Sequence, residues 1–184
     1  MNRGRSKASN VHRRRAAMPQ NPPPLHQFHV GSPKGARRMN AVSEALKSAE
    51  PTTSIKVDGK RLWDSLMTMA KIGATPKGGV CRLALTDLDK QGRDLIVSWA
   101  KEAGCTVSVD QMGNVFMRRA GRNPAALPVM TGSHADSQPT GGRFDGIYGV
   151  LGGLEVIRSL NDHGIETEHP IEVVIWTNEE GSRF

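Results

Sequence analysis

The feature that most constrains the fold is a strand, a helix and a second strand that follow one another toward the end of the chain. Residues 127–131 are a short apolar run of the kind found in buried strands. Residues 147–161 carry apolar side chains at helical spacing and end before Gly164, a residue type that commonly terminates helices. Residues 171–177, with the sequence IEVVIWT, form the strongest strand pattern in the chain. This order predicts a right-handed βαβ unit with parallel strands, and therefore an α/β fold.

The part of the chain before this unit adds two helices and a hairpin. Apolar residues at helical spacing predict a helix over residues 61–72. Thr86, followed by Asp89, resembles an N-cap pattern and opens a second helix. Residues 105–109 alternate between apolar and polar side chains, which is typical of a strand. Residues 110–113 predict a turn into a second strand over residues 114–117, so we expect an antiparallel hairpin beside the parallel core.

Residues 1–50 differ from the rest and account for the net charge. They hold ten of the 25 Lys and Arg residues but only two of the 18 acidic residues, and their apolar side chains follow no period. The remaining residues carry fifteen basic and sixteen acidic side chains, so the net charge of +7 says nothing about what the folded part binds. We expect a disordered basic extension over residues 1–50 and a folded domain over residues 51–184.

Three functional interpretations of the basic extension compete with disorder that serves no specific function. They are a nucleic-acid-binding arm, an organellar transit peptide, and an upstream extension that a start at Met39 would remove. A triple proline at residues 22–24 and the lack of an amphipathic stripe weigh against the transit peptide. Nucleic acid is not an expected partner of the folded part.

The sequence argues against a membrane protein and against a disulfide-stapled scaffold. It contains no run of about 18 apolar residues, and no continuous apolar segment typical of a signal peptide. Its two cysteines, Cys81 and Cys105, are too few for a small secreted scaffold or a cysteine-only zinc site. We therefore expect a cytoplasmic protein with two ordinary thiols and no membrane partner.

Polar side chains follow both strands of the predicted βαβ unit. His134 and Asp136 come after the first strand, and Asp145 lies just before the helix. Glu179 and Glu180 follow the second strand. Because the carboxyl ends of parallel strands meet at one edge of a sheet, these five side chains can converge. Four carboxylates in one crevice would repel one another unless divalent cations lay among them, and imidazole with carboxylates is a ligand set suited to zinc.

The positions of the acidic side chains suggest different roles in a metal site. Asp145, at the start of a helix and next to a glycine, is placed to reach inward and bridge two metal ions about 3.5–4 Å apart. Asp136, two residues after His134, can accept a hydrogen bond from the second imidazole N–H and fix the tautomer. Adjacent residues of an extended segment point to opposite sides, so one of Glu179 and Glu180 can hold a metal while the other acts as general base and acid.

Four motifs carry a family resemblance: TPKGGV at 75–80, RLALT at 82–86, GSHADSQPTGGRFDG at 132–146 and WTNEEGSRF at 176–184. Over residues 55–184 the sequence resembles the M20 metallopeptidase superfamily, in its hydantoinase/carbamoylase branch. That branch contains N-carbamoyl-L-amino-acid hydrolases, β-ureidopropionases and allantoate amidohydrolases. The resemblance implies that His134 and Glu180 are ligands of two different metal ions. It also implies that Asp145 bridges the two ions and that Glu179 is the catalytic acid and base.

The resemblance further implies a reaction, a cofactor and an assembly. The reaction is hydrolysis of the C–N bond of N-carbamoyl amino acids or related ureido compounds, by a homodimer with two divalent metal ions per site. Zinc is the first choice of metal, with manganese, cobalt or nickel as alternatives.

The family continues past the Glu pair with two more His ligands and an inserted lid or dimerisation domain, whereas this chain stops at Phe184. We therefore expect the N-terminal part of a metallohydrolase catalytic domain, inactive alone. The alternatives are a non-enzymatic truncated fragment and a basic-arm nucleic-acid-binding protein.

Overall fold

The computed structural model describes residues 54–184, and the basic extension predicted over residues 1–50 lies outside this range. The elements follow the predicted order of two helices, a hairpin and a βαβ unit. In chain order they are α2 (Gly59–Met69), α3 (Asp87–Glu102), β1 (Thr106–Val109), β2 (Val115–Arg119), β3 (Val129–His134), α4 (Ile147–Asp162) and β4 (Ile171–Trp176).

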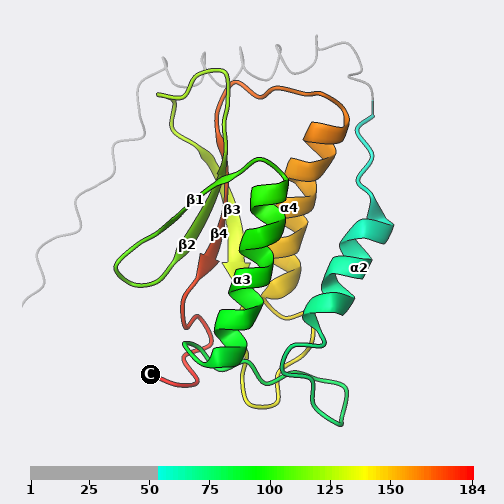
Figure 1. The fold of residues 1–184 in the computed structure, drawn as a ribbon, viewed down its shortest axis with the longest axis vertical. Helices are drawn as coiled ribbons and strands as arrows, with labels where there is room; N and C mark the ends of the chain where they lie inside the picture. Colours follow the sequence, from blue (N-terminus) through cyan, green and yellow to red (C-terminus); the bar gives the residue numbers. More distant parts are fainter. Residues whose placement is uncertain (1–53) are drawn as a thin grey trace, which may run out of the picture. The chain divides into compact units, whose positions relative to one another are not determined.

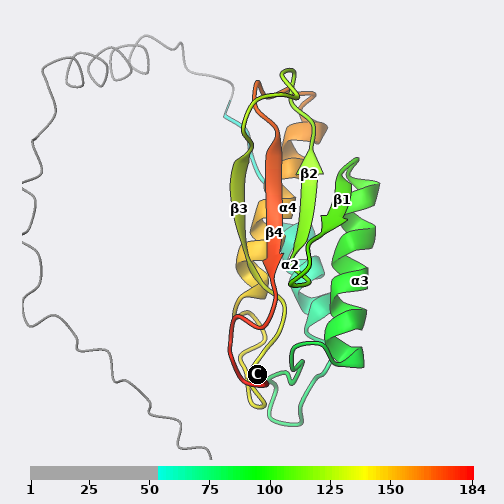
Figure 2. The same ribbon diagram turned by 90° about the vertical axis from the view of Figure 1, so that its left-hand side faces the viewer.

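The four strands form one mixed sheet in the order β1-β2-β4-β3 (Figure 2). β1 pairs with β2 and β2 with β4 in antiparallel fashion, which confirms the predicted hairpin. β3 and β4 run parallel, in a register that joins Val129 to Ile171 and His134 to Trp176. The α/β fold with a parallel βαβ core is thereby confirmed, and both parallel strands end at the same edge of the sheet.

Local sequence explains where the helices begin and end. Thr86 is the N-cap of α3, as predicted, and its hydroxyl accepts a hydrogen bond from the backbone N–H of Asp89 at 3.3 Å. Asp58 caps α2 in the same way through the N–H of Arg61. Gly164, just after α4, has a positive φ of 62° that suits glycine, so the helix ends where the sequence predicts.

The three described helices all lie on one side of the sheet, where α3 and α4 pack on the strands and α2 packs on α4 (Figures 1 and 2). α4 approaches β3 and β4 closely, because a Cβ placed on Gly153 would lie 2.9 Å from the Thr131 side chain and 3.1 Å from that of Val173. Between the layers lies a core of fully buried apolar side chains. It includes Met69, Ile96, Met117, Leu154, Val173 and Ile175. Among the described residues, no helix combines the length and the hydropathy that crossing a membrane requires.

The predicted burial of the first parallel strand is wrong. The prediction placed a buried strand over residues 127–131, but Leu127 is 84% exposed and Val129 and Met130 are also exposed. The reason is topological: β3 lies at an edge of the sheet and pairs with β4 alone. The strand also runs on to His134, so this histidine belongs to β3 and not to the loop that follows it.

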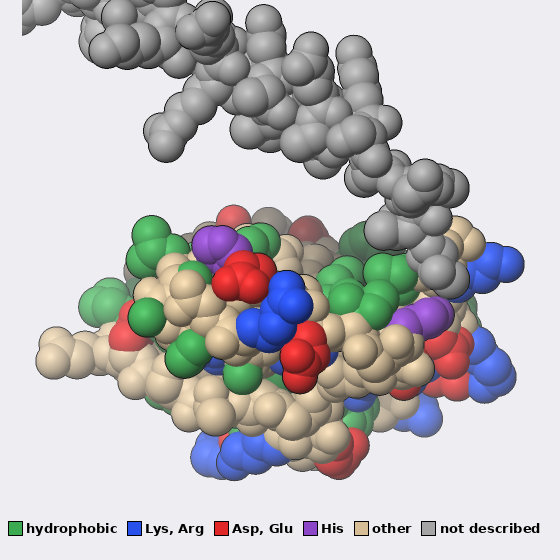
Figure 3. All heavy atoms as spheres, turned by 90° about the horizontal axis from the view of Figure 1, so that it is seen from above, with side chains coloured by type: hydrophobic (Ala, Val, Ile, Leu, Met, Phe, Trp, Pro, Cys, Tyr) green, Lys and Arg blue, Asp and Glu red, His purple; other side chains and the backbone are tan. Residues whose placement is uncertain are grey.

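The end of the molecule opposite the tips of β3 and β4 is shown in Figure 3, where acidic and basic side chains are interspersed. His163 and His169 are exposed, and each ring shares a hydrogen bond with a backbone carbonyl oxygen, of Ser159 and Leu127 respectively. Both histidines are therefore surface residues, as expected from the sequence.

Met117 provides a test of the core. Its side chain has no exposed surface, and we expect Met117→Ala to lower the free energy of unfolding by about 2–5 kcal/mol, because the deletion leaves a cavity. The matched control is Met112→Ala in the hairpin turn, where the side chain is 76% exposed and the expected loss is below about 0.5 kcal/mol. Urea denaturation followed by circular dichroism measures both. Equal losses in the two variants would contradict the described core.

Candidate metal centre

The candidate site lies where β3 and β4 end, near the start of α4 (Figure 1). His134 is the last residue of β3 and is buried. Its Nδ1 lies 3.0 Å from the backbone carbonyl oxygen of Asp136. Since a carbonyl oxygen can only accept, Nδ1 carries the proton, and in the neutral ring Nε2 keeps a free lone pair. The imidazole is therefore held in the tautomer that a metal ligand requires.

Carboxylates from two further segments face this lone pair. The Nε2 atom of His134 lies 3.3 Å from an oxygen of Glu179 and 4.0 Å from an oxygen of Asp145. His134, Asp145 and Glu180 each offer one ligand atom, and these three atoms lie within 4.8 Å of one another. The fold thus brings together all the residues that the sequence predicts for the site, across a separation of more than forty residues.

Buried oxygens without hydrogen-bond partners are a second indication, beside the three close ligand atoms, that the site suits a cation. Within residues 54–184, three buried side-chain oxygens have no hydrogen-bond partner, and all three belong to this region. They are Oδ1 of Asp136, Oδ1 of Asn178 and Oε1 of Glu180. An unpartnered buried acceptor costs about 1–3 kcal/mol, and a cation held by Glu180, the one of the three that belongs to the group of possible ligands, would remove that cost for its Oε1.

Asp136 does not make the contact that the sequence predicts. Its carboxylate was expected to accept the second imidazole N–H, but the nearer oxygen lies 3.7 Å from Nδ1, too far for a hydrogen bond. The backbone carbonyl of the same residue takes that role, because the chain curls back just after β3. The other carboxylate oxygen of Asp136 accepts the backbone N–H of Glu180 at 3.3 Å and so links the ends of the two strands.

Glu179 and Glu180 have different surroundings, although not for the predicted reason. They lie in a turn and not on an extended segment, because Asn178 has a positive φ of 56°. The side chain of Glu179 is 53% exposed, although one of its oxygens lies 3.3 Å from Nε2 of His134. Glu180 is half-buried, with one oxygen bonded to the side-chain amide of Gln138 at 2.8 Å and the other without a partner.

Sequence reasoning missed Arg82, Ser137 and Gln138 as supporting residues. Ser137 is buried, and its hydroxyl and N–H exchange hydrogen bonds with the backbone of Arg82, both at 2.8 Å. The Arg82 side chain is also buried, and burial lowers the pKa of its guanidinium. The only signal in the sequence was membership of the quoted motifs, because each contact joins residues far apart in the chain.

Gly146 determines how closely the helix approaches the imidazole. It has a positive φ of 66°, and a Cβ at this position would lie 2.4–2.5 Å from atoms of the His134 ring. No side chain fits there unless the ring moves.

We therefore expect Gly146→Ala to weaken zinc binding by the whole protein about tenfold or more, because the added methyl group displaces His134. Isothermal titration with Zn²⁺ measures the affinity, and a thermal melt checks the fold. Gly164→Ala is the matched control, since Gly164 has a similar φ of 62° but nothing within 4 Å of the added Cβ. Both substitutions carry the same backbone strain. Equal zinc affinities in the two variants would rule out the role given to Gly146.

Comparison with known proteins agrees with the geometry. Residues 130–183 match the model of Peptidase family M20/M25/M40, a segment that contains all five predicted site residues. The chain is 57% identical over 136 residues to the N-carbamoyl-L-amino-acid amidohydrolase of Rhizobium meliloti, covering 74% of this chain and 33% of that protein. It is 34% identical over 132 residues to the ureidoglycolate hydrolase of Arabidopsis thaliana, covering 72% of this chain and 28% of that protein.

Solved structures give the same result. The crystal structure of an amidase of the hydantoinase/carbamoylase family from Burkholderia multivorans superposes with a TM-score of 0.71 at 91% sequence identity. The match covers 72% of this chain and 32% of that one. The chain therefore spans about a third of the length of the relatives it matches. The family match and these identities confirm that the chain resembles part of the M20 peptidase family, in its hydantoinase/carbamoylase branch.

Proposed function

We propose that the protein containing this chain is a metal-dependent amidohydrolase that cleaves a C–N bond of N-carbamoyl amino acids or related ureido compounds. The observation that carries the proposal is the group of His134, Asp145 and Glu180, whose ligand atoms lie within 4.8 Å of one another beside unpartnered buried oxygens. The names of the relatives support the substrate class, since they include N-carbamoyl-L-amino-acid amidohydrolases and ureidoglycolate hydrolases.

The proposed cofactor is a pair of divalent metal ions, with zinc as the first choice and manganese, cobalt or nickel as alternatives. His134 would hold one ion and Glu180 the other, and Asp145 would bridge them. A mixed imidazole and carboxylate set suits these metals. When bound, such ions polarise the scissile carbonyl group and lower the pKa of water.

Glu179 is the proposed acid and base. Its carboxylate is exposed at the site, so it can meet both the attacking water and the substrate nitrogen. It takes a proton from the water as the new C–O bond forms at the carbamoyl carbon. It then gives that proton to the departing nitrogen as the C–N bond breaks. The other product of this cleavage is a carbamic acid, whose remaining C–N bond breaks as it loses carbon dioxide, so the final products are an amino acid, ammonia and carbon dioxide.

The remaining parts of the proposal concern the whole protein. We propose a homodimer that acts on a small ureido or carbamoyl molecule, in the cytoplasm. The two free cysteines, Cys81 and Cys105, are compatible with a reducing compartment.

Glu179→Gln tests the acid and base. In the whole protein, we expect kcat for ammonia release from an N-carbamoyl-L-amino acid to fall on the order of 10²–10⁴-fold, because the amide cannot carry the proton. Zinc content should be unchanged, since Glu179 is not a proposed ligand. Glu168→Gln is the matched control, with a similarly exposed side chain (58%) in an ion pair with Arg122. If Glu179→Gln retains normal turnover, the role assigned to Glu179 is wrong.

Metal removal tests the cofactor. Dialysis of the whole protein against a chelator should abolish ammonia release, and addition of Zn²⁺, Mn²⁺, Co²⁺ or Ni²⁺ should restore it. The circular dichroism spectrum should hardly change, because the sheet and the helices pack without the site. Full activity in a preparation shown to be metal-free would contradict the proposal.

A further inference from the structure

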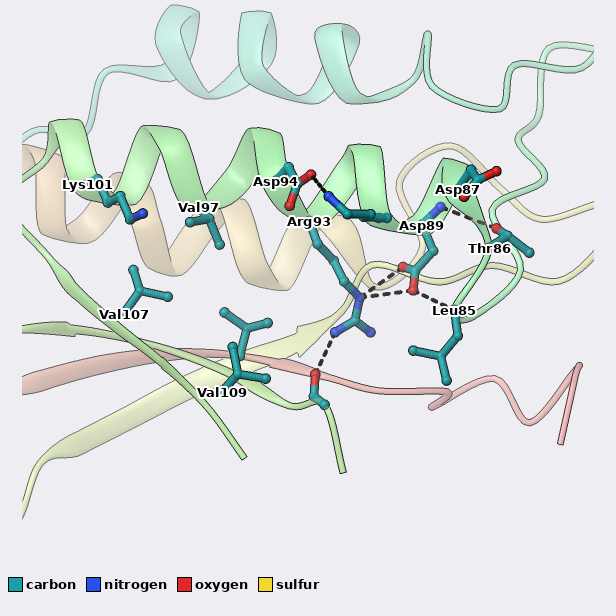
Figure 4. Close-up of a pocket in the computed structure, with 13 residues that line it drawn as sticks. Leu85, Thr86, Asp87, Asp89, Arg93, Asp94, Val97, Lys101, Val107 and Val109 are labelled. Atoms are coloured by element: carbon teal, nitrogen blue, oxygen red, sulfur yellow. Dashed lines mark hydrogen bonds and ion pairs between the residues drawn. The ribbon is translucent and has the colours of Figure 1, made fainter. Parts of the chain in front are cut away.

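A buried arginine connects α3 to the end of β4. Arg93 is 8% exposed and lies at the floor of the groove between α3 and β1, where Figure 4 shows it pointing away from the helix toward the strands. Its Nε donates to both carboxylate oxygens of Asp89, one turn earlier in the helix, each at 3.0 Å. This pairing compensates the charge of the buried guanidinium.

The far side of the guanidinium binds three groups at the ends of the strands. Nη1 donates to the carbonyl oxygen of Gly113 at 3.0 Å and to the hydroxyl oxygen of Thr177 at 3.1 Å. Nη2 reaches the carbonyl oxygen of Trp176 at 3.4 Å. The planar guanidinium of Arg93 therefore fixes helix α3, the hairpin turn and the end of β4 relative to one another.

The residues held in this way come directly before the acidic turn. Thr177 is followed by Asn178, with its positive φ, and then by Glu179 and Glu180. The direction in which the chain leaves β4 therefore depends on Trp176 and Thr177. A shift there would move both glutamates away from His134.

The end of β3 has a matching contact. Arg82 is buried, and its Nε donates to the carbonyl oxygen of Ala135 at 3.0 Å, directly after His134. Its Nη1 donates to the carbonyl oxygen of Ile72 at 2.9 Å, in the loop after α2. Each of the two strand ends that carry the site is thus bound by one buried arginine from outside the sheet.

We propose that Arg93 is a positioning residue of the metal centre. It sets where the turn of Glu179 and Glu180 lies relative to His134, and Arg82 does the same for the other strand end. This inference rests on the proposed function, because it assigns a role toward the metals of that same site. Lysine at position 93 keeps the positive charge beside Asp89 but lacks the planar fork that reaches the strand ends.

The test compares Arg93→Lys with Arg119→Lys in the whole protein that contains this chain. Arg119 is the matched control because its guanidinium also binds several groups, the side-chain oxygens of Asn161 and Thr167 and the carbonyl of Ile165, but at the opposite end of β2. Titration with Co²⁺ alone, followed by visible absorption, gives both the affinity and the coordination geometry. Thermal melts report the fold.

We expect Arg93→Lys to weaken Co²⁺ binding about 10- to 100-fold and to alter the absorption bands, since the ligand turn is no longer held in place. Arg119→Lys should lower the melting temperature to a similar degree while leaving the affinity and the bands unchanged. A purely structural role for Arg93 predicts the same spectrum and affinity in both variants, which would overturn the inference.

A second variant keeps the test decisive if Arg93→Lys does not fold. Thr177→Val removes one acceptor of the guanidinium at the end of β4 and leaves the pair with Asp89 in place. It should also weaken Co²⁺ binding and shift the bands, and unchanged values would overturn the inference. If the unsubstituted whole protein binds no Co²⁺, the proposed function itself fails. If it binds Co²⁺ and the variants at positions 93 and 177 bind it equally well, only the positioning role fails.

Discussion

The parallel pairing of β3 with β4 is the interaction on which the site depends. It sets His134 opposite Trp176, so that the histidine ends one strand where the acidic turn is about to leave the other. Because side chains alternate between the two faces of a strand, a slip of one residue would turn His134 toward the other face. α4 stabilises the register, since it returns the chain over both strands and packs its Gly153 against Thr131 and Val173.

The site contains buried oxygens without hydrogen-bond partners, whereas a comparably buried carboxylate elsewhere in the fold has its partners. Glu155 is as deeply buried as Asp136, yet its oxygens accept hydrogen bonds from Arg61, Ser159 and the backbone N–H of Asp58. By contrast, the unpartnered buried oxygens of the described residues all lie near the tips of β3 and β4. Unpartnered acceptors cost stability, so their restriction to one place is a reason to expect a cation there.

The sequence predicted the elements whose signals are local. The N-cap of α3 at Thr86 follows from neighbouring residues, as does the turn of the hairpin, where Asp110 accepts the backbone N–H groups of Met112 and Asn114. The exposure of β3 could not be predicted in this way. An apolar run such as residues 127–131 looks the same at the centre of a sheet and at its edge, and only the pairing partners decide how much of it is buried. The turn at Asn178 was also missed, since an asparagine with positive φ leaves no clear mark in a strand-like segment.

The five site residues could be predicted because they carry chemistry and follow strand ends, whereas the residues that hold them could not. Arg82 contacts Ala135 across 53 positions, and Arg93 contacts Trp176 across 83. In the sequence Arg93 looks like an ordinary surface charge, Arg82 is marked only by its place in the RLALT motif, and no periodicity relates either residue to the site. The contacts of Asp136 were also not predictable, although this residue lies within the motif at residues 132–146. Its spacing from His134 indicated a partner for the imidazole, but its side chain holds the backbone of Glu180 instead. Asp136 and the two arginines together tie the strand ends to each other and to the helical layer, so the distance between His134 and Glu180 is determined by buried contacts and not by the two loops alone.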